Sequence, residues 1–83
     1  MSWLDSYYGK DRKTFDPCVV MEGVKYAVVL IRKSAKGSSS MGYVLLKKNG
    51  KHSVSPQKSL HEGVANRADM DRMIEELKRA EAQ

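Results

Sequence analysis

The chain has 83 residues, 41% of them hydrophobic and 30% charged, with a formal net charge of +5, which predicts one small folded domain over residues 1–83 rather than a disordered chain. Its single cysteine excludes an internal disulfide and fits a reducing, cytoplasmic setting. The longest aliphatic run, residues 27–31, is too short to span a bilayer, and the first residues lack the apolar core of a signal peptide, so we expect no membrane association.

The N-terminal residues 2–8 predict a short helix that Ser2 caps and Gly9 ends. Residues 9–17 are polar and end in Pro17, so we expect a connecting loop anchored by Phe15. Aromatic and basic side chains are close together in this region: Trp3, Tyr7, Tyr8 and Phe15 beside Lys10, Arg12 and Lys13. They could form a base-stacking platform. A domain of this size needs its aromatic side chains for the core, so packing is the favoured interpretation.

Residues 18–21 and 24–33 predict two strands joined by a tight turn at Glu22-Gly23. Both alternating faces of the second strand are apolar in its middle, which indicates a central strand covered on both sides. Cys18 opens an apolar run, so we expect it to be a buried, inert hydrophobe. Residues 34–40, "SAKGSSS", predict a flexible loop without the spacing of a phosphate-binding loop, and residues 41–48 predict the third strand.

Asn49-Gly50 is typical of a two-residue hairpin, here leading to a short polar edge strand at 51–55 that Pro56 ends. After an irregular stretch at 56–65, Asn66 is expected to cap a helix beginning near Ala68. Its apolar residues recur at helical spacing and predict packing on a sheet: Met70, Met73, Ile74 and Leu77. The sequence therefore predicts an α+β fold with a short N-terminal helix, an antiparallel three- to four-stranded β-meander and a C-terminal amphipathic helix packed on the sheet.

Reactive side chains are few and show no grouping. His52 and His61 match no zinc-ligand spacing, and one cysteine cannot complete a structural metal site with them. A cysteine–histidine pair can form through space, but nothing in the sequence indicates one. We therefore expect no catalytic residue, no metal and no cofactor, and a protein that is not an enzyme.

Positive charge is concentrated in the middle of the chain, since no Asp or Glu occurs between Gly23 and His61. In the predicted hairpin Lys48 lies opposite Lys51, where like charges are destabilising. Such lysines can simply protect a sheet edge from aggregation. The absence of carboxylates favours a role in ligand binding, with candidate residues at the hairpin tip and in adjoining loops: Lys47, Lys48, Lys51 and His52, with Lys33, Lys36 and Lys58.

Two functions fit these observations. The first is a small non-enzymatic binding module whose basic sheet and hairpin face engages nucleic acid or a nucleoprotein through charge neutralisation, with little base reading. The alternative is a viral or mobile-element accessory protein that docks on an acidic patch of a larger host protein and inhibits it, for example a CRISPR effector or another nucleic-acid machine. No family resemblance distinguishes them, and the sequence leaves the target and the oligomeric state open.

Overall fold

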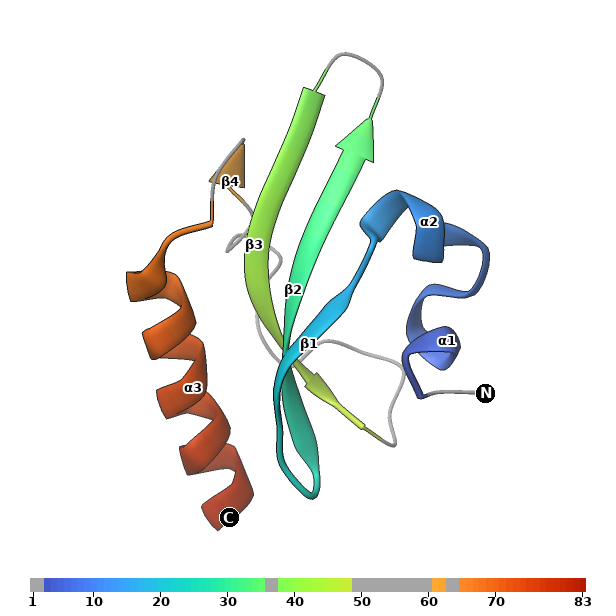
Figure 1. The fold of residues 1–83 in the computed structure, drawn as a ribbon. Helices are drawn as coiled ribbons and strands as arrows, with labels where there is room; N and C mark the ends of the chain where they lie inside the picture. Colours follow the sequence, from blue (N-terminus) through green and yellow to red (C-terminus); the bar gives the residue numbers. More distant parts are fainter. Residues whose placement is uncertain (1–2, 36–37, 49–60, 63–64) are drawn as a thin grey trace.

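The computed structural model describes residues 3–35, 38–48, 61–62 and 65–83 and has the predicted α+β fold (Figure 1). Three short helical turns come first, followed by an antiparallel sheet and a long C-terminal helix. In chain order the elements are α1 (Trp3–Tyr8), the 3-10 turn η1 (Gly9–Asp11), α2 (Arg12–Phe15), β1 (Cys18–Glu22), β2 (Tyr26–Ala35), β3 (Ser38–Lys47), β4 (His61–Glu62) and α3 (Arg67–Ala82).

The sheet has the order β1-β2-β3-β4, with every neighbouring pair antiparallel. β2 pairs along its whole length with β3, whereas β1 pairs only with Ala27 to Leu30 of β2. The N-terminal helical turns and α3 lie on opposite sides of the sheet (Figure 1). The described residues therefore form a three-layer arrangement with β2 and β3 at its centre.

Two cores form because β2 and β3 point alternate side chains to the two faces. One core lies under the N-terminal turns and consists of Leu4, Ala27, Val29, Ile31, Val44 and Leu46. The other lies under α3 and consists of Val28, Leu45, Met73 and Leu77. The expectation of a central strand covered on both sides is confirmed, as is the packing of the helix that carries Met73 and Leu77.

Two local signals at helix ends are confirmed, whereas Ser2, the expected cap of the first helix, lies outside the described residues. The Asn66 side chain accepts a hydrogen bond from the backbone N–H of Asp69 at 2.9 Å and caps α3. Gly9 adopts φ +47°, a left-handed conformation that ends α1 and that a residue with a Cβ rarely takes. None of the helices among the described residues has both the length and the apolar character needed to cross a membrane.

Several expectations are wrong. Residues 9–15 form further helical turns rather than a loop. The stretch predicted as a flexible loop at 34–40 is mostly strand, because its serines join the β2–β3 ladder through backbone pairing that composition does not reveal. Cys18 is exposed rather than buried, because β1 is an edge strand. β4 begins at His61, inside the stretch predicted as irregular, while the strand predicted at 51–55 lies outside the described residues.

The last turn of α3 is fixed to the turn between β1 and β2 by Glu81. Its Oε1 atom accepts hydrogen bonds of 2.7 Å from the backbone N–H groups of both Lys25 and Tyr26. The Lys25 ammonium donates in turn to the backbone carbonyl of Gln83 at 3.0 Å. A Cβ at Gly23 would lie 2.5 Å from the same Glu81 oxygen, so a side chain at this position would displace the Glu81 carboxylate.

This contact makes stability depend on pH. Partial burial raises the pKa of Glu81, but hydrogen bonds from Tyr26, Lys25 and Val24 and the Lys25 charge outweigh it, so the pKa lies below its ordinary value. A lowered folded-state pKa stabilises the fold above the unfolded-state pKa, and this stabilisation is lost as the pH falls through the folded-state pKa. Glu81→Gln is therefore expected to lower the melting temperature at pH 7, and the difference from wild type should shrink below about pH 4.3.

Melting curves followed by circular dichroism between neutral and acidic pH would measure this difference. Glu75→Gln is the matched control, because Glu75 belongs to the same helix and faces Lys78 on its surface at 3.7 Å. If the difference in melting temperature between Glu81→Gln and wild type stays constant with pH, the lowered pKa of Glu81 is contradicted.

Candidate functional site

Three of the lysines that the sequence marks for ligand binding lie among the described residues: Lys33, Lys47 and Lys48. The other candidate residues, Lys36, Lys51, His52 and Lys58, lie outside the described residues. Lys33 pairs with Ser40 near one end of the β2–β3 ribbon, and Lys47 pairs with Tyr26 at the other end. At about 3.3 Å per residue these positions are roughly 23 Å apart. The structure thus brings Lys47 and Lys48 together but places Lys33 elsewhere, and the ligand role of this group stays a prediction.

Lys48 is engaged within the fold. Its ammonium group lies 3.0 Å from Glu22 Oε1 and donates to the Gly23 carbonyl at 3.2 Å. The same Glu22 oxygen accepts from the indole N–H of Trp3 at 3.1 Å. The hydrogen bonds from Lys48 and Trp3 and the Lys48 charge lower the pKa of Glu22, against the opposing effect of burial. The fold therefore supplies the lysine-rich segment with a carboxylate that is distant in the sequence, and Lys48 has a structural role.

Lys33 and its neighbour Arg32 join the end of β2 to the N-terminal helical turns. The Lys33 ammonium lies 5.3 Å from the centre of the Phe15 ring, a cation–π contact. Arg32 Nε lies 3.2 Å from Asp16 Oδ2 and 3.3 Å from the Asp16 carbonyl oxygen. Two cations that the sequence places in a strand thus lie beside the basic segment at residues 10–13.

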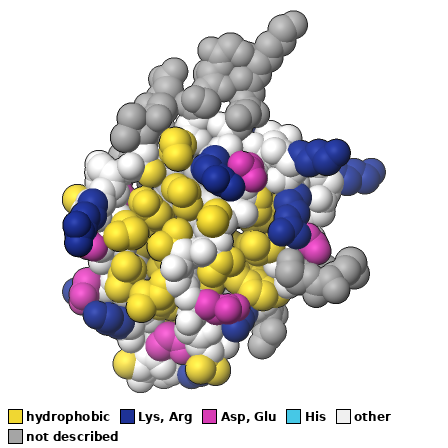
Figure 2. All heavy atoms as spheres, in the orientation of Figure 1, with side chains coloured by type: hydrophobic (Ala, Val, Ile, Leu, Met, Phe, Trp, Pro, Cys, Tyr) yellow, Lys and Arg dark blue, Asp and Glu magenta, His cyan; other side chains and the backbone are white. Residues whose placement is uncertain are grey.

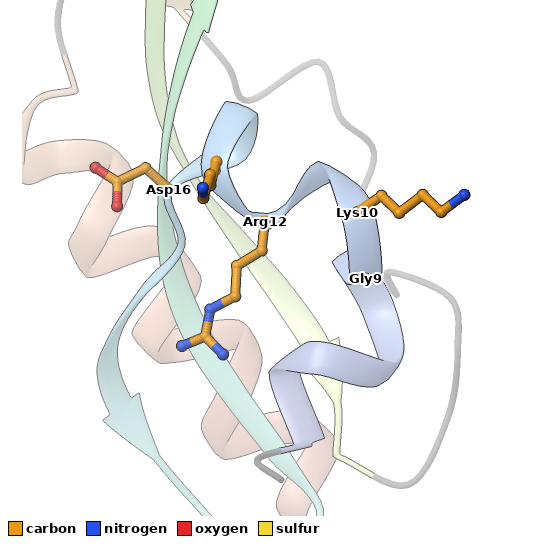
Figure 3. Close-up of a pocket in the computed structure, with 5 residues that line it drawn as sticks. Gly9, Lys10, Arg12 and Asp16 are labelled. Atoms are coloured by element: carbon orange, nitrogen blue, oxygen red, sulfur yellow. The ribbon is translucent and has the colours of Figure 1, made fainter.

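A hollow of about 610 Å³ lies in this segment (Figure 3). We call it the basic hollow, and its lining residues are Gly9, Lys10, Arg12, Lys13 and Asp16. Arg12 forms an ion pair with Asp5, and Asp16 is paired with Arg32. In Figure 3 the side chains of Lys10 and Arg12 extend in different directions. A site for a small molecule has a few polar groups that converge, so this arrangement fits an extended anion better.

The aromatic side chains beside the basic hollow belong to the core, as the sequence favoured. Trp3, Tyr7, Tyr8 and Phe15 are partly buried and pack on the core under the N-terminal turns. Burial, with the neighbouring Tyr7 adding a smaller effect, raises the pKa of Tyr8 to about 12. The Tyr7 hydroxyl donates to the backbone carbonyl of Lys47. These partly buried rings pack the basic segment against the core.

Sequence reasoning missed the basic hollow as a site, because it treated residues 9–17 as a loop and Lys10, Arg12 and Lys13 only as neighbours of the aromatics. The available signal was the density of cations in "KDRK" at 10–13. In residues 3–35, 38–48, 61–62 and 65–83 no group of three or more His, Cys, Asp or Glu could hold a metal ion. No family model, curated protein or solved structure matches this chain.

Proposed function

We propose that the chain is a small non-enzymatic module that binds nucleic acid through the cations around η1 and α2. The observation that carries this proposal is the basic hollow, together with the two cations at the end of β2 that lie beside it. We call the combined set of cations the basic surface: Lys10, Arg12, Lys13, Arg32 and Lys33.

Three features support a polyanion as the ligand. The cations lie on η1, α2 and β2, and the side chains of Lys10 and Arg12 extend in different directions in Figure 3. The carboxylate of Asp16, which would repel a phosphate, is partly neutralised by Arg32 at 3.2 Å. The basic hollow has a volume of about 610 Å³ and is lined by residues of more than one element. A phosphate backbone presents its charges at intervals along such a surface.

The proposed mechanism is charge neutralisation with release of counterions, and it carries little sequence specificity. Lysine ammonium groups contact phosphates as point charges. Arginine is best suited to bidentate contacts with guanine edges, but Arg12 and Arg32 are paired with Asp5 and Asp16. An acidic patch on a larger host protein would attract the same cations, and this alternative is an outcome of the test below.

The expected result is a loss of oligonucleotide binding in the double variant Lys10→Gln/Lys13→Gln. Removing one lysine–phosphate interaction should reduce the slope of log K against log salt by about 0.9, so the double variant should lower the slope for duplex DNA by about 2. Fluorescence polarisation with a labelled duplex of mixed sequence, titrated at several salt concentrations, measures both affinity and slope. Lys78→Gln/Arg79→Gln on α3 is the control with the same change of charge.

A second double variant, Lys47→Gln/Lys51→Gln, distinguishes this surface from the lysine-rich segment that the sequence singled out. If that variant reduces the slope and Lys10→Gln/Lys13→Gln does not, the basic hollow is the wrong site. If the wild-type chain does not bind duplex or single-stranded oligonucleotides even at low salt, nucleic acid is the wrong ligand. An acidic protein partner would then be tested instead. For such a partner, added salt should mainly lower the association rate constant.

A further inference from the structure

Asp16 and Arg32 form an ion pair between two segments that the sheet brings together. β1 begins with Cys18 opposite Leu30 of β2, and continuing this antiparallel register by two residues places Asp16 opposite Arg32. Arg32 Nε lies 3.2 Å from Asp16 Oδ2 and 3.3 Å from the Asp16 carbonyl oxygen. The register of the sheet thus sets a carboxylate against one cation of the basic surface.

The backbone of Asp16 has a conformation in which glycine is the usual residue. Asp16 ends α2 with φ 43° and ψ 59°, and its N–H donates to the Arg12 carbonyl at 2.8 Å. A Cβ makes this left-handed conformation unfavourable, so glycine is the common choice at such a helix end. Aspartate is tolerated there better than most residues but still carries a conformational cost. What aspartate adds over glycine at this position is a carboxylate beside Arg32.

The ion pair is exposed, so its partners can be exchanged. The side chains of Arg32 and Asp16 are 44% and 59% exposed, and ion pairs in contact with water contribute little to stability. A phosphate forms charge-assisted hydrogen bonds with a guanidinium as a carboxylate does. Because one guanidinium carries a single positive charge, it cannot fully neutralise the Asp16 carboxylate and a phosphate together. The two anions therefore compete for Arg32.

Asp16 is the carboxylate that bears most directly on the basic surface. Acidic and basic side chains are interspersed over the face shown in Figure 2, but among the residues that line the basic hollow Asp16 is the acidic one. In Figure 3 its side chain extends away from Lys10. Lys33 lies over the Phe15 ring, an uncharged partner that does not neutralise it. The effect of Asp16 thus falls on Arg32 rather than on these lysines.

We propose that Asp16 limits how tightly the basic surface holds nucleic acid, because it competes with a backbone phosphate for Arg32. This inference rests on the nucleic-acid function proposed above and adds to it a residue that opposes binding. In the free protein the Asp16 carboxylate pairs with Arg32. In the complex a phosphate takes its place, and breaking the ion pair lowers the affinity below what the cations alone would give.

Asp16→Asn tests the competition, because asparagine keeps the size of the side chain and tolerates the left-handed backbone but carries no charge. Freeing Arg32 for one more phosphate should steepen the slope of log K against log salt for duplex DNA by about 0.9. If the wild-type and variant lines meet near 1 M salt, this slope corresponds to roughly eightfold tighter binding at about 0.1 M. Fluorescence polarisation with the labelled duplex measures both quantities.

Asp11→Asn is the matched control for the change of charge. Asp11 lies in the same basic segment, and its side chain makes no capping hydrogen bond to α2. This variant should leave the slope unchanged. Melting temperatures establish that the variants are folded, and Asp16→Gly, which suits the left-handed backbone, should reproduce the steeper slope of Asp16→Asn.

A double-mutant cycle determines whether the effect of Asp16 passes through Arg32. In the Arg32→Gln background, adding Asp16→Asn should no longer steepen the slope, because the cation that it frees is absent. A steeper slope that persists without Arg32, or one that Asp11→Asn produces equally, would make Asp16 only one more negative charge and overturn the proposal.

The same titrations separate this proposal from the function on which it rests. If the wild-type chain binds duplex DNA and Lys10→Gln/Lys13→Gln weakens it, but Asp16→Asn changes neither affinity nor slope, the competition is overturned and the nucleic-acid function stands. If neither the wild-type chain nor Asp16→Asn binds oligonucleotides at low salt, both are overturned. Binding by Asp16→Asn without measurable binding by the wild-type chain would support the competition in its strongest form.

Discussion

Replacing Leu77 with alanine is expected to lower the free energy of unfolding by about 2–5 kcal/mol, because the side chain is fully buried and its removal leaves a cavity. Leu77 is 3% exposed and packs with Val28, Leu45 and Met73 between α3 and the sheet. Urea denaturation followed by far-UV circular dichroism measures the change. Glu75→Ala, on the exposed side of the same helix, should change the free energy of unfolding by no more than about 0.5 kcal/mol.

A loss below about 1 kcal/mol for Leu77→Ala would mean that α3 does not depend on this contact, since full burial predicts a larger effect. The experiment is informative because α3 is the sole helix among the described residues that covers its face of the sheet. Without its anchor, the core that β2 and β3 share with α3 becomes exposed.

The opposite face should respond equally strongly. Ile31 is 1% exposed and belongs to the core with Leu4, Val44 and Leu46. Ile31→Ala is expected to lower the free energy of unfolding by about 2–5 kcal/mol, and Ile31→Val by about 0.5–1.5 kcal/mol. The valine variant keeps the measurement possible if the alanine variant does not fold, since small domains have a margin of only about 5–15 kcal/mol.

Ile31 and Leu77 also offer a test of the two-core arrangement. They lie in different cores on opposite faces of one sheet. Ile31→Val and Leu77→Ala should therefore add within about 0.5 kcal/mol in the double variant. A strong interaction between the two substitutions would contradict the separation of the cores.

Elements with an internal pattern were predictable from the sequence. The helical spacing from Met70 to Leu77 and the Asn66 cap indicated α3, and the apolar run in the middle of residues 24–33 indicated a strand buried on both faces. Both patterns indicate which side chains are buried away from water. The exposure of Cys18 to Met21 was not predictable in this way, because an apolar run looks the same in a central strand and in an edge strand.

The candidate site was predictable only in part. The excess of cations was evident, but their grouping was decided by contacts between distant segments. Lys48 meets Glu22 because β3 ends beside the turn after β1, and Lys33 meets Phe15 because α2 lies against β2. Such neighbours follow from sheet order and layer placement, which no local spacing encodes.

The turn at residues 22–26 connects all three layers, and this has a consequence for how the domain unfolds. Trp3 from α1 and Lys48 from the end of β3 both bond to Glu22, while Glu81 from α3 bonds to the backbone of Lys25 and Tyr26. Neither outer layer can separate from the sheet without breaking bonds to this one turn. The two cores share no side chain, but because both outer layers bond to this one turn we expect them to unfold together, in a single cooperative step.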